Sequence, residues 1–291
     1  MNAYFLVIIE DILLSVVFAC QKKYQNISGS RMKAGLFYNG LTGLFSAVMF
    51  LFINQFDVKI TGYSILMAAL FATVIMLYII LGFKIMEKGN MSLYTLFLMA
   101  GGMTVPYVWG VIFLNEELTL LRTLGLLVII AAVTVANASG EKTDKKQLLL
   151  CVAVFFLNGT ASVISKTHQI SPAQEVVTSP DFAFLVMTFK AVACSLLILF
   201  NRKKFFVETK EGISFQKILP VIVLASLADG ISYMCQLMGA AALPATVLFP
   251  LVTGGTVILS AFAGFLAFRE KPSQKQWIGV ALCFVGTLLF L

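Results

Sequence analysis

The chain has 291 residues, of which 59% are hydrophobic and 12% are charged, and its mean hydropathy is +0.94. A soluble domain is closer to half apolar and one quarter charged, so this composition excludes a soluble globular protein. The net charge is +7, but most of the charge falls in short clusters between apolar runs, which argues against a nucleic-acid partner.

Ten apolar runs have the roughly 17–25 residues that cross a bilayer. In chain order they are residues 3–21, 33–54, 63–86, 92–114, 120–138, 147–166, 182–200, 217–239, 244–268 and 276–291. The connections between them are too short to hold a soluble domain. The sequence therefore predicts an all-α polytopic membrane protein with ten transmembrane helices.

Basic residues are distributed unequally between the connections. The odd-numbered connections hold 17 of the 21 Lys and Arg residues, and the even-numbered ones hold three, Lys59, Arg122 and Lys166. Cytoplasmic connections carry the excess of basic residues, so the odd connections are predicted to be cytoplasmic and both termini extracytoplasmic. Lys22 and Lys23 follow the first run and no basic residue precedes it, which favours a retained helix over a cleaved signal peptide. We expect a multi-pass protein of the plasma (cytoplasmic, inner) membrane.

A glycine pair, an acidic residue and a further glycine occur twice along the chain. The first copy is Gly101-Gly102, Glu116-Glu117 and Gly125, and the second is Gly254-Gly255, Glu270 and Gly279. We interpret residues 1–138 and 147–291 as two five-helix repeats joined by a polar linker, residues 139–146. Because five is odd, the second repeat enters the membrane with inverted orientation, and such folds bind their substrate in a central cavity between the repeats.

Three segments resemble a known family. Leu114 to Gly125, with Ala267 to Gly279 as a second occurrence, resembles the helix-end signature of EamA-type proteins of the drug/metabolite transporter superfamily. Asn158 to Lys166 is similar to the sixth helix of such proteins and to the first helix of small multidrug transporters, with Asn158 at the position of their coupling glutamate. The resemblance implies a secondary carrier whose cavity is lined by helices 1, 3, 4, 6, 8 and 9. Members move amino acids, drugs, sugars and nucleotide sugars, and many keep their termini in the cytoplasm, unlike the orientation indicated here.

Four ionisable residues stand out because they lie well inside the apolar runs rather than at their ends: Glu10, Asp11, Lys190 and Asp229. Each costs at least about 2.5–3.5 kcal/mol on insertion scales, so such groups usually face water, substrate or a partner. Glu10 and Asp11 point about 100° apart on a helix, so one is expected to line the cavity while the other meets a cation such as Lys190. Lys190 has two interpretations, a structural partner for Asp229 or Glu10, and a ligand for a substrate carboxylate. Glu116 is interpreted as a helix-boundary residue.

Polar residues form stripes on two of the predicted helices. One stripe contains Asp229, Ser232, Tyr233 and Gln236, and the other contains Asn158, Ser162, Ser165 and Gln169. This helical spacing puts each set on one face and indicates a shared polar cavity; the alternative is hydrogen bonding between helices at about 0.6 kcal/mol each. His168, the only histidine, is expected at the membrane interface.

Aromatic side chains of the third and fourth runs include Tyr78 and Tyr94. Such rings attract cationic ligands through cation–π interactions, although most membrane aromatics pack or anchor at the interface. We add both to the candidate binding residues.

We predict a secondary active transporter of a small cationic or zwitterionic metabolite or drug, working by alternating access and coupled to protons. A buried carboxyl group favours its neutral form, which allows it to exchange a proton for a cationic ligand. The alternatives are a membrane scaffold and an integral-membrane enzyme; the single histidine argues against the enzyme. The sequence has no cofactor or metal-binding motif, and its expected partners are the solute, protons and lipid, with the chain as a monomer or homodimer.

Overall fold

The computed structural model describes residues 3–29, 32–86, 91–136, 144–172, 175–200, 215–268 and 273–290. Within these ranges the chain forms α-helices and no strand. The helices are α1 (Ala3–Ser28), α2 (Met32–Ile53), α3 (Gly62–Met86), α4 (Met91–Phe113), α5 (Leu120–Ala136), α6 (Lys145–Ile170), α7 (Ser179–Phe200), α9 (Phe215–Ala242), α10 (Ala245–Phe268) and α11 (Gln274–Leu288).

The all-helical, multi-pass character predicted from the sequence is confirmed. Each predicted apolar run corresponds to one described helix. Eight of these helices are long and apolar enough to cross a membrane, while α5 is apolar but has only 17 residues and α11 has 15. Glu270, part of the second copy of the repeated pattern, and most of the proposed linker lie outside the described residues.

The helix ends follow local chemistry. Asp144 caps α6 by accepting a hydrogen bond from the Gln147 backbone N–H, at 2.6 Å. Ser273 and Gln276 form a reciprocal capping box at the start of α11. Helix N-termini expose N–H groups without intrahelical acceptors, so side-chain oxygens at these positions stabilise the start of the helix.

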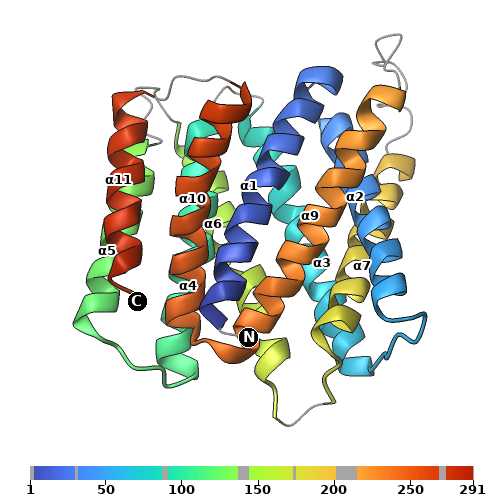
Figure 1. Cartoon of the computed structure of the whole chain (residues 1–291), viewed down its shortest axis with the longest axis horizontal. Coiled ribbons are helices and arrows are strands. Elements are labelled where there is room, and N and C mark those ends of the chain that lie inside the picture. The colour runs from blue at the N-terminus through green and yellow to red at the C-terminus, as the bar shows by residue number, and fades with distance from the viewer. Residues whose placement is uncertain are drawn as a thin grey trace.

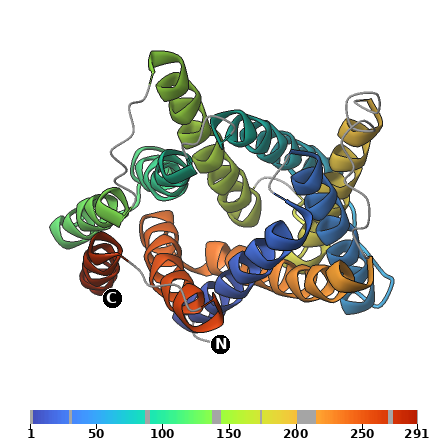
Figure 2. The same cartoon turned by 90° about the horizontal axis from the view of Figure 1, so that it is seen from above.

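The helices form an elongated bundle in which the two halves of the chain interleave (Figures 1 and 2). Seen from above, α5 and α11 lie together at one end of the bundle and α2 and α7 at the other. Both chain ends lie toward the lower edge of Figure 1, and α9 connects to α10 at that same edge. We call it the lower end.

The packing partners of the first five helices mirror those of the second five. Helix α1 packs on α9 and α10, and its counterpart α6 packs on α3 and α4. Helix α2 packs on α9 as α7 packs on α3. The remaining large contacts join equivalent helices, α2 with α7, α5 with α11 and α4 with α10. The two halves are therefore held together along the whole length of the bundle.

Glycines permit the closest of these helix contacts. A Cβ at Gly43 of α2 would lie 3.0 Å from the Met187 carbonyl oxygen of α7. At Gly101 of α4 it would overlap the backbone carbonyl of Phe155 in α6. Small residues let membrane helices approach until their backbones touch, so Gly101 fixes the spacing between α4 and α6.

We expect Gly101→Ala to destabilise the protein by about 1–3 kcal/mol, because an added methyl group forces α4 and α6 apart. Gly62→Ala is the matched control, since a Cβ there has no atom within 4 Å. Thermal unfolding in detergent measures both variants. Equal unfolding temperatures for the two variants would show that the α4–α6 contact does not limit stability.

Candidate functional site

The neighbouring acids of α1 face different helices. Glu10 is 1% exposed and its Oε1 accepts a hydrogen bond from Gln236 Nε2 of α9, at 2.9 Å. Asp11 is 5% exposed and its Oδ1 accepts one from Thr256 Oγ1 of α10, also at 2.9 Å. The second oxygen of Glu10, Oε2, is buried and has no hydrogen-bond partner. One carboxylate oxygen of Glu10 thus lacks a hydrogen-bond partner in the interior, whereas the Asp11 carboxylate is hydrogen-bonded to Thr256.

Lys190 of α7 forms an ion pair with Asp229 of α9, with 2.9 Å between Nζ and Oδ2. Of the two partners that the sequence analysis allows for Lys190, the structure therefore selects Asp229, and the expected contact with Glu10 or Asp11 is not formed. Asp229 also lies close enough to Tyr38 and Tyr78 to interact electrostatically with both phenols. This ion pair between two helices is a polar centre within an apolar bundle.

The Asp229 side chain is accessible from inside the bundle. It is 23% exposed, yet it lies roughly 200° around α9 from Leu227. Leu227, Leu224 and Val223 form the exposed apolar face of this helix and are 43%, 52% and 37% exposed. Because Asp229 points away from this face, its exposure reflects space on the interior side of α9.

The two polar stripes predicted from the sequence meet in the structure. Tyr233 Oη of the α9 stripe lies 3.1 Å from Ser165 Oγ of the α6 stripe. Gln236 joins the same stripe to Glu10 of α1. From Asp229 to Gln236 the stripe covers about 10 Å along α9 and connects polar groups of α1, α6 and α7.

Asn158 and Ser162 bind backbone rather than one another's side chains. Asn158 Nδ2 donates to the Leu98 carbonyl at 2.8 Å, and Ser162 Oγ donates to the Gly102 carbonyl at 3.4 Å, both in α4. A Cβ at Gly102 would lie 2.6 Å from Asn158 Nδ2. These contacts favour the interhelical hydrogen-bonding interpretation for this part of the α6 stripe.

The two candidate tyrosines lie in the packed region between α3, α4 and α6. The Tyr94 ring covers Gly82, where a Cβ would lie 2.5 Å from the ring. Tyr78 and Tyr94 pack against buried Ile85 and Cys151. Tyr94 therefore serves helix packing, while Tyr78 is the one near Asp229.

The repeated glycine pairs serve equivalent contacts in the two halves. Gly102 of α4 makes room for Asn158 of α6, and Gly255 of α10 makes room for the Asp11 carboxylate of α1. Since α1 corresponds to α6 and α4 to α10, a carboxylate in one half occupies the place of an amide in the other. The interior is therefore chemically asymmetric, with the acidic side at α1 and α10.

The structure gives three charged or titratable residues surroundings that the sequence did not indicate. Lys166, assigned to a connection, lies within α6 and is 4% exposed. His168, expected at the interface, is fully buried, with Nε2 2.8 Å from Ser64 Oγ and its ring stacked on Phe182. Glu116 does follow the end of α4, but its carboxylate binds the first N–H groups of α10. The unbroken helical spacing from Asn158 to Gln169 was the signal that α6 continues past Lys166.

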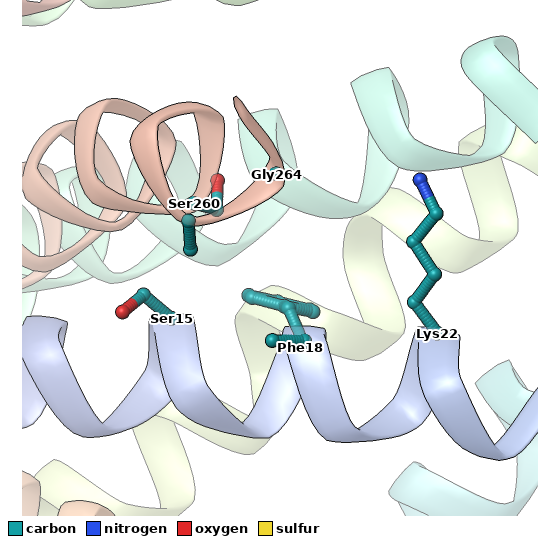
Figure 3. Close-up of a pocket in the computed structure, with 7 residues that line it drawn as sticks. Ser15, Phe18, Lys22, Ser260 and Gly264 are labelled. Carbon is teal, nitrogen blue, oxygen red and sulfur yellow. The ribbon is translucent and has the colours of Figure 1, made fainter. Parts of the chain in front are cut away.

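A pocket of about 100 Å³ opens between α1 and α10, one helical turn beyond the Asp11–Thr256 contact. It is lined by Ser15, Phe18, Ala19, Lys22, Ser260, Ala263 and Gly264. Figure 3 shows Ser15 and Phe18 between the two helices, with Lys22 farther along α1. Among the described residues, no group of three or more His, Cys, Asp or Glu side chains is placed to hold a metal ion.

We predict that Lys190 and Asp229 are energetically coupled. Removing either partner leaves the other charge unpaired, so Lys190→Met and Asp229→Asn should each destabilise the protein. The double variant should be less destabilised than the sum of the two single effects. We expect a coupling energy of about 0.5–3 kcal/mol from a double-mutant cycle of unfolding free energies. Strictly additive effects would indicate that the pair contributes nothing to stability.

Three comparisons place the chain among known proteins. The family model described as EamA-like transporter family matches residues 145–291, which is half of the chain. No curated protein matches it. A solved structure titled "Crystal structure of protein" is similar, with a TM-score of 0.78 and 16% identity, and the alignment covers 99% of this chain and 96% of that one. The structural likeness shows a shared fold, and the family match shows that the chain belongs to the EamA-like transporter family.

Proposed function

We propose that the protein is a secondary active transporter that carries a small cationic or zwitterionic solute by alternating access between two inverted five-helix halves. The single observation that carries this proposal is the polar centre around α9, where the ion pair of Lys190 and Asp229 is reachable from the interior. An integral-membrane ionisable group facing an internal space marks a solute or proton pathway. Family membership supports transport of small solutes.

The packing pattern supports the inverted repeat. Equivalent helices make equivalent contacts in the two halves, and five helices per half require opposite orientations. The chain ends at the lower end of Figure 1 agree with an even number of crossings. With the basic connections in the cytoplasm, the lower end faces the extracytoplasmic side.

Glu10 is the group that we assign to proton exchange. Its buried Oε2 has no partner, whereas the Asp11 carboxylate is bonded to Thr256 and that of Asp229 is paired with Lys190. Its hydrogen-bond partner is the neutral Gln236, and the neighbouring Asp11 is acidic. We therefore assign Glu10 a bound proton that a cationic solute displaces.

The α1–α10 pocket supports a zwitterion as the substrate. Ser15 Oγ donates its hydrogen to the Ile12 carbonyl at 2.7 Å, and Ser260 Oγ donates to the Val257 carbonyl at 3.2 Å. Both hydroxyl groups therefore offer lone pairs to the pocket, which suits an ammonium group. Lys22 lines the same pocket on the side away from Ser15, where a cation suits a carboxylate (Figure 3). The pocket thus favours a molecule with its amine directed toward the middle of the membrane.

Asp229→Asn should abolish saturable solute flux in proteoliposomes while leaving the helical content unchanged, because the ion pair at the polar centre is lost. The solute is chosen by a thermal-shift screen of amino acids, amines, sugars, nucleosides and dyes. Ser195→Ala is the control, since Ser195 Oγ bonds only within its own helix, to the Ala191 carbonyl. Flux that survives in the Asp229 variant would remove this residue from the pathway.

Glu10→Gln should make solute flux indifferent to an imposed pH gradient, because the amide cannot release a proton. Asp11→Asn, one residue along, should keep the pH response and lower stability through the weakened Thr256 contact. Flux is measured with and without an inward-directed gradient. A wild-type protein that ignores the gradient would indicate facilitated diffusion instead.

The preference for a zwitterion is tested with three solutes that share one side chain: an amino acid, the amine lacking its carboxylate, and the acid lacking its amine. The wild type should bind the amino acid best, and Lys22→Gln should lose that preference over the amine. Lys23→Gln, an exposed neighbour on a different face of α1, is the control. Equal affinity of the wild type for amine and amino acid would leave a cation as the substrate class.

A further inference from the structure

Two charged side chains that the polar centre does not use meet at the connection between α9 and α10. The Glu116 carboxylate, just beyond α4, accepts hydrogen bonds from the backbone N–H groups of Ala245 and Thr246, at 2.7 and 2.8 Å. The Lys166 ammonium, near the end of α6, donates to the carbonyl groups of Ala240 and Leu243, both at 2.6 Å. We call this arrangement of Glu116 and Lys166 around residues 240–246 the junction clamp.

The clamp matches the electrostatics of the two helix ends. The C-terminus of α9 presents unpaired carbonyl groups and a partial negative charge, and Lys166 supplies the opposite charge. The N-terminus of α10 presents unpaired N–H groups and a partial positive charge, and Glu116 supplies a carboxylate. Glu116 and Lys166 also attract one another across the connection. The connection is therefore bound by charge from α4 on one side and from α6 on the other.

The local backbone is built to present Glu116. Asn115 has a φ of 52°, a left-handed conformation that Asn tolerates better than most residues and that turns the chain at the end of α4. The Glu116 N–H then bonds the Gly110 carbonyl at 3.0 Å. A Cβ at Gly110 would lie 2.6 Å from Glu116 Oε2, so only glycine leaves space for the carboxylate.

The clamp lies at the most deeply buried part of α10. The first two turns of α10, from Ala245 to Val252, are buried throughout, with no residue more than 7% exposed among those measured there. They pack with Met103 and Tyr107 of α4 and with Ile129 of α5 in one apolar cluster. Toward its other end α10 becomes accessible, and Phe262 and Phe265 are 42% and 45% exposed. In this structure α10 is thus tightly packed at the end that the clamp holds, and more accessible at the other end.

We propose that the junction clamp is the extracytoplasmic gate of the transport cycle, with Glu116 and Lys166 as positioning residues that hold the gate shut. This inference rests on the proposed alternating-access function. Opening the lower end requires the α9–α10 connection to leave α4 and α6, which breaks all four charge-assisted hydrogen bonds. Loss of either side chain should therefore favour the state that is open at this end.

The test follows the accessibility of one buried position, through a Val252→Cys variant treated with a membrane-impermeant maleimide from the extracytoplasmic side. Val252 is 7% exposed, and the five native cysteines are all buried, so the chain without the substitution gives the background. We expect slow labelling in this variant alone. Adding Glu116→Gln or Lys166→Met should speed it roughly tenfold or more, the effect of losing charge-assisted hydrogen bonds.

Two controls separate gating from general damage. Glu117→Gln removes the adjacent exposed carboxylate, and Lys146→Met removes an exposed charge at the far end of α6; neither should change labelling. Glu116→Asp keeps the charge on a shorter side chain and should restore part of the slow labelling. Unchanged labelling in both Glu116→Gln and Lys166→Met, or equal acceleration in Glu117→Gln, would overturn the gate. Faster labelling in a protein without solute flux would preserve the clamp and refute the transport function instead.

Discussion

Charge inside a bilayer has to be compensated, and that requirement organises this structure. Each unpaired ionisable group in the hydrocarbon carries a cost of several kcal/mol, and here the compensation comes from a different helix in every case. Lys190 is paired with Asp229, Lys166 binds the end of α9, and Asp11 is bonded to Thr256. Of these contacts, the one between Asp11 and Thr256 links the two halves, while the other two join helices within the second half.

The charges divide into two groups along the membrane normal. At the lower end, Glu116 and Lys166 are fully engaged with backbone groups that belong to helix termini. Their partners do not depend on a solute, so a structural or gating role suits them. Nearer the middle, Asp229 is accessible and Glu10 retains an oxygen without a partner. Of these four side chains, only the second group has capacity left for a proton or a solute.

The relation between the two halves adds a further constraint. Asp11 packs against Gly255, and Asn158 packs against Gly102 at the equivalent place in the other half. Of the two side chains, only that of Asp11 can carry a charge. The amide at Asn158 holds α4 against α6 through its bond to the Leu98 carbonyl, and of the two equivalent places only the one at α1 and α10 has a carboxylate.

Much of the fold was predictable because membrane burial leaves strong signals in sequence. Apolar runs, helical spacing of polar residues and glycine pairs located the helices, the α9 stripe and the close contacts. The roles of Lys166 and Glu116 were not predictable, because each binds backbone groups of a connection more than 70 residues away. No local pattern encodes such a contact. The choice between Asp229 and Glu10 as the partner of Lys190 likewise depended on how α1, α7 and α9 cross.

The most direct test of the account is the number of protons released when solute binds to the purified protein, measured by titration calorimetry in buffers of different ionisation enthalpy. The solute is the one that gives the largest thermal shift. The account predicts proton release by the wild type and by Asp11→Asn, and none by Glu10→Gln. Equal release by the wild type and Glu10→Gln, or no release by the wild type, would contradict the assignment of Glu10 as the group that exchanges its proton for the solute.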